Sequence, residues 1–233
     1  MQSLDGKIAI VTGAGRGIGR AISIELAAHG ATVFGAARSA GQLEETRQII
    51  QADTRGTFVP IPLDATRENE VQHCFSVAEA QGPVDILVNN AGGGAPAALL
   101  DVSLADWEQQ MAVNVRSMFL FTREAARVML PRQRGDIVNL SSLAGKKPIP
   151  GYAAYTASKF AAVGFSEAIA RELRKGGIRV LSICPGAVAT DMRKQVAREE
   201  NPELITQPGQ IASLIAFFLT RGVGARDLSF DLF

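Results

Sequence analysis

The stretch that decides the fold is residues 7–28, KIAIVTGAGRGIGRAISIELAA. Residues 7–12 form an apolar, β-branched run typical of a buried strand, while Ile18, Ile22 and Leu26 line one face of a helix predicted over 18–28. Four glycines, Gly13, Gly15, Gly17 and Gly19, lead from the strand into the helix, where the backbone can approach a phosphate group and the helix N-terminus offers free N–H groups. The stretch therefore predicts a strand, a glycine turn and a helix arranged to bind a dinucleotide pyrophosphate.

Two details limit what the glycine turn establishes by itself. The strict GxGxxG spacing is not met, because residue 18 is isoleucine, and no Gly-Lys-Ser/Thr sequence follows, which disfavours a mononucleotide P-loop. A glycine-rich turn without any ligand is the alternative at this point. The rest of the chain has to decide between them.

The remainder of the chain repeats this alternation of short apolar runs and longer helical patterns. Further strands are predicted at 32–36, 57–62, 85–89, 136–141 and 178–184, with an edge strand at 227–233. Helices are predicted at 41–52, 68–80, 104–130, 152–175 and 210–219. Nearly continuous apolar strands are typical of parallel sheets covered on both faces. We predict an α/β fold, a Rossmann-like doubly wound parallel sheet in a single domain over 1–233, with ligands at the carboxyl ends of the strands.

Composition excludes several classes of function. Lys and Arg number 24 against 23 Asp and Glu, and a net charge of +1 gives no long-range field for nucleic acid or an anionic membrane. No apolar stretch approaches the roughly 18 residues of a membrane span, and no secretion signal is visible. Cys74, Cys184, His29 and His73 fit no metal-ligand spacing. We expect a soluble cytoplasmic protein with no metal and no nucleic-acid or membrane partner.

The end of the second predicted strand bears on the choice of dinucleotide. A site for NAD usually has an acidic residue here that bonds the ribose 2′-hydroxyl, whereas a 2′-phosphate needs a cation. This chain has Ala37 and Arg38, and Arg16 in the glycine turn adds a second guanidinium suited to phosphate. The pattern favours NADP (NADPH), with two solvated surface arginines as the alternative.

Tyr155 and Lys159 are four residues apart in a predicted helix, so their side chains share a face. A nearby ammonium stabilises a phenolate and lowers its pKa toward the working pH for proton exchange with a substrate oxygen. The spacing alone is weak evidence for a catalytic pair, because an amphipathic surface helix often carries a tyrosine and a lysine four residues apart by chance.

Other motifs strengthen this signal by their order and spacing. They are Thr12 to Gly19 as TGxxxGIG, Asn89-Asn90-Ala91-Gly92, Asn114, Ser142, Tyr155-x-x-x-Lys159 and Pro185 to Thr190 as PGAVAT. Together they resemble the short-chain dehydrogenase/reductase family, in the branch with an Asn-Ser-Tyr-Lys tetrad. The resemblance runs from about Lys7 to Thr190.

The resemblance implies a role for each member of the tetrad. Tyr155 is expected to be the general acid or base, and Ser142 to orient the substrate oxygen and stabilise its charge. Lys159 is expected to hold the nicotinamide ribose and lower the tyrosine pKa, and Asn114 to hold a water that passes protons from Lys159 to solvent. The residues expected to bind the cofactor are Gly13, Gly15, Arg16, Gly17, Ile18, Gly19, Arg38, Asp64, Ala65, Asn90, Ala91, Gly92, Tyr155, Lys159, Pro185, Gly186, Val188 and Thr190.

The resemblance implies an oxidoreductase that moves hydride between the nicotinamide and a ketone or secondary alcohol. The alternative is a catalytically silent dinucleotide-binding protein that senses redox state or scaffolds a partner. The chain departs from the family at its end, GARDLSFDLF, where a TG...DGG segment is common. The charged segment 191–209 is either a lid over the site or a solvated helix.

We also expect a homodimer or homotetramer. The two long predicted helices, 104–130 and 152–175, carry apolar residues expected to form the contact between copies. These residues are Val115, Met118, Phe119, Phe165 and Ile169.

Overall fold

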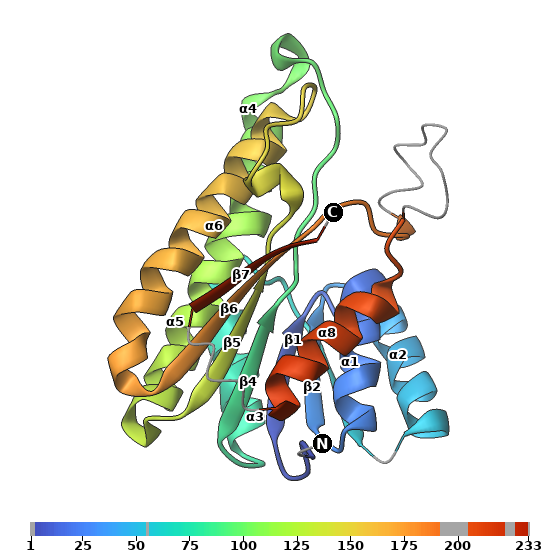
Figure 1. Cartoon of the computed structure of the whole chain (residues 1–233). Coiled ribbons are helices and arrows are strands. Elements are labelled where there is room, and N and C mark those ends of the chain that lie inside the picture. The colour runs from blue at the N-terminus through green and yellow to red at the C-terminus, as the bar shows by residue number, and fades with distance from the viewer. Residues whose placement is uncertain (1–2, 55, 192–204, 222–226, 233) are drawn as a thin grey trace.

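The computed structural model describes residues 3–54, 56–191, 205–221 and 227–232. They form a parallel sheet of seven strands in the order β3-β2-β1-β4-β5-β6-β7, seen edge to edge in Figure 1. The strands are β1 (Ile8–Thr12), β2 (Thr32–Ala37), β3 (Thr57–Pro62), β4 (Val84–Asn89), β5 (Gly135–Leu140), β6 (Ile178–Pro185) and β7 (Asp227–Leu232). Strand order reverses between β1 and β4, which is where doubly wound sheets bind ligands.

Helices cover both faces of the sheet (Figure 1). One face carries α1 (Gly17–Ala28), α2 (Ala40–Asp53) and α8 (Pro208–Arg221), and the other carries α3 (Glu68–Glu79), α4 (Leu104–Met111), α5 (Ser117–Met129) and α6 (Ala153–Leu173). None of the helices in the described part of the chain is both long and apolar enough to cross a membrane. The α/β doubly wound fold predicted from the sequence is confirmed.

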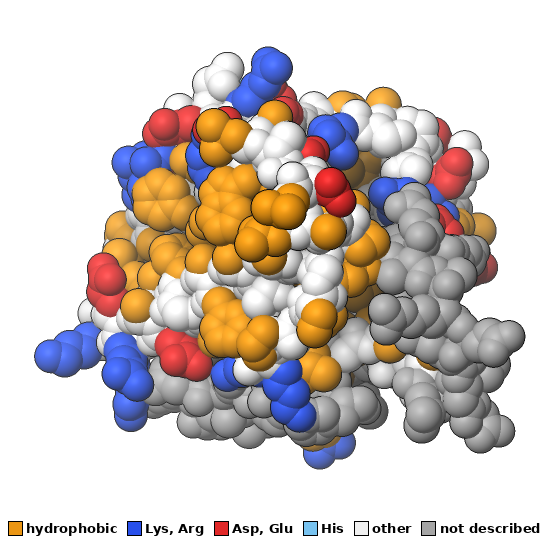
Figure 2. All heavy atoms as spheres, turned by 90° about the horizontal axis from the view of Figure 1, so that it is seen from above, with side chains coloured by type: hydrophobic (Ala, Val, Ile, Leu, Met, Phe, Trp, Pro, Cys, Tyr) orange, Lys and Arg blue, Asp and Glu red, His pale blue; other side chains and the backbone are white. Residues whose placement is uncertain are grey.

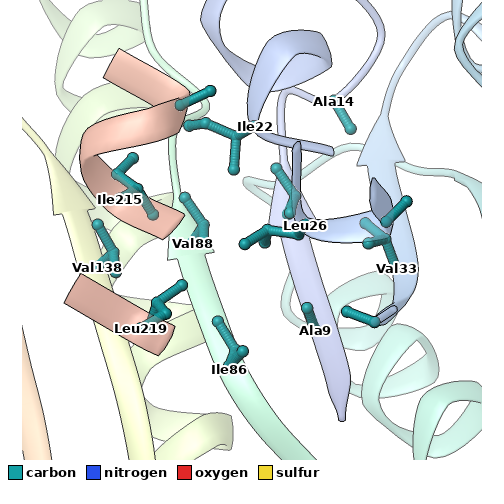
Figure 3. Packing of buried hydrophobic residues seen from close by; sticks show 14 of the residues in the cluster. Ala9, Ala14, Ile22, Leu26, Val33, Ile86, Val88, Val138, Ile215 and Leu219 are labelled. Carbon is teal, nitrogen blue, oxygen red and sulfur yellow. The ribbon is translucent and has the colours of Figure 1, made fainter. Parts of the chain in front are cut away.

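Alternation along the strands produces two separate cores. In β1, Ala9 and Val11 face α1, where they pack with Ile22 and Leu26 in the cluster drawn in Figure 3. Ile8 and Ile10 face the opposite way and belong to the cluster under α3, α5 and α6. Because successive strand residues point to opposite faces, a strand buried on both sides must be apolar throughout, as β1 is.

The helix predicted over 104–130 runs without a gap but is not α-helical throughout. A π-helical turn at Ala112–Arg116 separates α4 from α5. The Asn114 side chain lies in this turn and is bonded at both of its polar atoms to the backbone of Gly93 in the loop after β4. The extra residue of a π turn brings that side chain to the loop, and hydrophobic periodicity does not reveal such a turn.

The end of the chain forms the predicted edge strand, because β7 pairs parallel with β6 from Val180 to Pro185. Most of the charged segment 191–209 lies outside the described residues, so neither the lid nor the solvated helix is tested there. Its last part is anchored to the loop after β6, since the Thr206 N–H donates to Ala187 O at 3.0 Å and the Ala189 N–H to Thr206 O at 2.9 Å.

Candidate active site

One cleft of about 1540 Å³ opens at the carboxyl ends of the strands. It is lined by the segments that follow β1, β2, β3, β4, β5 and β6, together with the first turns of α6. All the residues proposed from the sequence line this cleft except two, Gly19 and Asn114. Those two lie behind its wall and contact residues that do line it.

The glycine turn has the shape of a phosphate cradle. Gly13 and Gly17 have φ angles of +67° and +55°, a region that residues with a side chain rarely adopt. A Cβ on Gly19 would lie 2.2 Å from Gly13 O, so only glycine fits there. The residue preceding α1, Arg16, makes no side-chain cap hydrogen bond, and Gly17 and Ile18 at the start of the helix line the cleft. The turn therefore fits a pyrophosphate, which binds to uncapped helix N-termini.

A hydroxyl at the end of β1 ties the turn to the loop after β4. Thr12 Oγ1 accepts hydrogen bonds of 2.9 Å from both the Asn90 and the Ala91 N–H and donates to Val88 O. The side-chain Nδ2 of Asn90 in turn donates to the backbone oxygen of Thr12 at 2.9 Å. This pairing holds the two loops on either side of the point where strand order reverses.

Two guanidinium groups lie at one end of the cleft. Arg16 and Arg38 are both exposed and both line it beside Asp64. Partial burial raises the pKa of the Asp64 carboxyl, but hydrogen bonds from the Thr66 N–H and hydroxyl and the charges of Arg67 and Arg38 outweigh this and hold the pKa below its usual value. Asp64 is thus a carboxylate whose charge is already compensated, and the end of the cleft stays suited to an anion.

At the other end, three side chains from two elements meet. Ser142 follows β5, and its hydroxyl accepts the Ala144 N–H at 3.1 Å and is hydrogen-bonded to the Tyr155 phenol. Lys159, one turn after Tyr155 on α6, places Nζ 5.7 Å from the centroid of the tyrosine ring and 3.4 Å from Leu140 O. A hydroxyl, a phenol and an amine therefore converge on one point of the cleft.

Burial dominates the protonation of this cluster. It raises the pKa of Tyr155; the hydrogen bond from Ser142 opposes this rise, and electrostatic repulsion from the neighbouring Tyr152 adds to it. Burial lowers the pKa of Lys159 to about 8, against a small opposing effect of Cys184. The pKa of Tyr155 is shifted by burial, Ser142 and Tyr152, so the expected effect of Lys159 on that pKa stays a prediction.

Asn114 supports the cluster from behind. Its Oδ1 accepts the Gly93 N–H and its Nδ2 donates to Gly93 O, both at 2.8 Å. Nδ2 also donates to Ser158 Oγ at 2.9 Å, and that hydroxyl donates to Tyr155 O at 2.7 Å. The side chain thus joins the loop after β4 to the turn of α6 that carries the tyrosine and the lysine.

The substrate side of the cleft is narrow beside the phenol. Gly94 lies flat against the Tyr155 ring, since a Cβ there would come within 2.3 Å of Cδ2. The Tyr152 ring lies edge-on, with its centroid 6.1 Å from that of Tyr155. Other lining residues on this side are mostly apolar: Pro96, Gln109, Val113, Leu143, Ile149 and Pro150.

Comparison with known proteins identifies the family of this cleft. The sequence model described as short chain dehydrogenase matches residues 7–201, most of the chain. The chain belongs to the short-chain dehydrogenase/reductase family. The resemblance noted from the motifs is therefore confirmed.

Relatives of this short-chain dehydrogenase/reductase match nearly its whole length. The 3-oxoacyl-acyl-carrier-protein reductase FabG of Vibrio cholerae is 33% identical over 225 residues, covering 93% of this chain and 91% of that protein. The human (3R)-3-hydroxyacyl-CoA dehydrogenase is 34% identical over 239 residues, covering 93% and 90%.

Solved structures agree in fold. A dehydrogenase/reductase from Sinorhizobium meliloti 1021 has a TM-score of 0.89 at 32% identity, covering 99% of this chain and 94% of that one. A metagenomic short-chain oxidoreductase in complex with NADP has a TM-score of 0.85 at 33% identity, covering 98% and 97%.

Sequence reasoning missed two contributors to the site of this short-chain dehydrogenase/reductase. Thr12 was quoted within a motif but given no role, although a hydroxyl that ends an apolar strand is a usable signal. Ser158 was passed over entirely. The only hint of it in the sequence is a small polar residue directly before Lys159.

Proposed function

We propose that the protein is an NADPH-dependent oxidoreductase that interconverts a ketone and a secondary alcohol, with Tyr155 as the general acid and base. The observation that carries the proposal is the convergence of the Tyr155 phenol, the Ser142 hydroxyl and the Lys159 amine beside a glycine turn that fits a pyrophosphate. The reductase relatives and the neighbour solved with NADP support it.

The roles of the side chains follow from where their polar atoms lie. When bound, the nicotinamide supplies or accepts the hydride at the carbonyl carbon. Ser142 would donate a hydrogen bond to the substrate oxygen and hold it within reach of the phenol. Tyr155 would give its proton to that oxygen as negative charge develops there, producing the alcohol, and would take the proton back in the reverse direction. Lys159 would return a proton to the tyrosine, since its pKa of about 8 allows it to exchange protons near neutral pH.

The proposed preference for NADPH rests on the two arginines. Arg16 and Arg38 line the same end of the cleft, and the position before Arg38 is Ala37 rather than an acid. A guanidinium pairs with phosphate through two parallel hydrogen bonds, which a ribose hydroxyl does not offer. Affinities for NADPH and NADH measured on the unmodified protein test this directly, and equal values contradict it.

Turnover with a panel of carbonyl compounds tests the reaction itself. The panel includes simple ketones, cyclic ketones and 3-oxoacyl thioesters, with NADPH oxidation followed by absorbance. Reduction of at least one ketone supports the proposal. Tight NADPH binding with no turnover of any member favours the alternative of a silent redox sensor.

We further propose that the protein associates with a second copy through the face of α4, α5 and α6. Phe119 and Phe160 are 42% and 43% exposed, and Trp107 is 40% exposed. Two residues expected on this face, Met118 and Ile169, are instead buried in the core, because helical rotation turns them toward the sheet. Apolar side chains also gather on the face of the molecule seen in Figure 2. Near the start of α4, Leu99, Leu100 and Leu104 are exposed.

Light scattering decides the state of association. A dimer or tetramer at micromolar concentration supports the proposal, and a monomer contradicts it. Replacing Phe119 and Phe160 by serine should shift the equilibrium toward the monomer without loss of the fold, because neither side chain is part of either core.

A further inference from the structure

A positively charged side chain stands where the dipole of α1 disfavours it. Arg20 is in the first turn of α1, at the end that carries partial positive charge. Its guanidinium reaches back to the glycine turn, where Nε and Nη2 both donate to Gly15 O at 3.0 and 2.5 Å. Two donors on one carbonyl oxygen hold that peptide in a single orientation.

The same guanidinium also grips the neighbouring helix. Nε donates to Thr46 Oγ1 at 3.1 Å, and Nη2 contacts Gln42 O at 3.4 Å and Glu45 Oε2 at 2.7 Å. Thr46 is fully buried, and its hydroxyl lies 3.1 Å from Ala14 O in the turn. Arg20 is therefore a cross-link between the glycine turn and α2.

The two segments that Arg20 joins are the ones that carry the proposed phosphate-binding arginines. Arg16 follows Gly15 directly, and a planar trans peptide sends its N–H away from the carbonyl that Arg20 holds. On the other side, α2 begins two residues after Arg38, with Ser39 capping it by accepting the Gln42 N–H. Fixing the turn against α2 fixes the spacing of the two guanidinium groups.

We propose that Arg20 is a positioning residue that sets the preference for a 2′-phosphate without touching the cofactor. The inference rests on the proposed NADPH dependence. If the cross-link is lost, Arg16 and Arg38 no longer converge on one phosphate, whereas NADH makes no use of that convergence. Loss of the cross-link should therefore reduce the ratio of NADPH to NADH affinity more than it reduces the affinity for the part that both cofactors share.

Arg20→Lys and Arg20→Met test the inference together. Lysine keeps the charge, but a single ammonium does not reproduce the planar fork that spans the turn and α2. Arg47→Lys is the matched control, because Arg47 lies on α2, the helix that Arg20 contacts, and its guanidinium pairs with Glu44 at 2.6 Å on the outer surface. Dissociation constants for NADPH, NADH and 2′,5′-ADP are measured on all variants, with thermal unfolding as the check of the fold.

Both Arg20 variants should weaken NADPH and 2′,5′-ADP by about tenfold and NADH by less than about threefold, since residues that orient ligand-binding groups typically contribute about 10- to 100-fold. The inference is overturned if Arg20→Lys keeps the full preference for NADPH over NADH. It is overturned if only Arg20→Met weakens NADPH binding, because that pattern indicates an effect of charge alone. Equal weakening of the binding of all three ligands also contradicts it. It is also overturned if Arg47→Lys gives the same change. Equal affinity of the unmodified protein for NADPH and NADH contradicts the proposed function itself, whatever the variants do.

Discussion

The two ends of the cleft use opposite means to handle charge. At the end proposed to bind the nucleotide, Arg16 and Arg38 are exposed to solvent, and Arg20 joins the glycine turn to α2 by hydrogen bonds to Gly15 O and Thr46 Oγ1. At the end proposed to be catalytic, Lys159 is only 5% exposed, and burial of its amine disfavours the charged form and lowers its pKa to about 8. From this comparison we propose that the exposed charges select the cofactor through affinity, whereas the buried titratable groups act through proton transfer. Changes at the two ends should therefore alter different measured quantities.

The largest effect is expected at the catalytic end, from Tyr155→Phe. This change removes the phenol that we propose as the proton donor and acceptor, and general acid–base groups contribute about 10²- to 10⁴-fold to the rate. Turnover should fall by that factor while the NADPH dissociation constant changes less than about twofold. A variant that keeps more than about a tenth of the turnover would show that another group transfers the proton.

The nucleotide end should give the reverse pattern. Arg38→Ala removes a charged hydrogen bond worth about 1.5 to 3 kcal/mol, so NADPH should bind roughly 10- to 150-fold more weakly while NADH is nearly unchanged. Ala37→Asp should weaken NADPH by repulsion and improve NADH. Calorimetric titration of both cofactors measures this, and parallel loss of both on changing Arg38 argues against a 2′-phosphate contact.

The two ends of the cleft also differ in how much of each could be predicted from the sequence. Arg16 and Arg38 were found because charge and spacing are visible in the sequence, and the strands were found because runs such as IAIV are apolar on both faces. The π turn at Ala112–Arg116 and the link through Ser158 depend on how α5 and α6 pack, which no periodicity encodes. The low pKa of Lys159 likewise results from the burial of its side chain against the end of β5.

Buried charge at Lys159 should make stability depend on pH. Its pKa falls from 10.5 to about 8 on folding, so the unfolded chain binds more protons between these values. The cost of the buried ammonium is complete below pH 8 and is relieved as the pH rises toward 10.5. The free energy of unfolding of Lys159→Met should therefore exceed that of the unmodified protein most near pH 7. About 2 kcal/mol of this difference should disappear by pH 9.5. Urea unfolding at the two pH values measures this difference in stability. A difference that does not vary with pH would show that the Lys159 amine is exposed to solvent in the folded protein.

The smallest expected effect concerns Ser158, and it separates positioning from stability. Ser158→Ala leaves the Asn114 amide and the Tyr155 carbonyl without their shared partner, and an unsatisfied buried polar group costs about 1 to 3 kcal/mol.

Ser166 is the matched control, because it lies on the same helix, is equally buried, and accepts a hydrogen bond of 2.9 Å from Asn139. Both alanine variants should lower the melting temperature by a few degrees, at about 2 to 4 °C per kcal/mol. Only Ser158→Ala should also reduce kcat, by about three- to tenfold at unchanged NADPH affinity, because small misplacements of reacting groups are costly. Equal kcat in the two variants would reduce Ser158 to a purely structural residue, whereas recovery of kcat in Ser158→Thr, which keeps a hydroxyl, would assign the effect to the hydrogen bond.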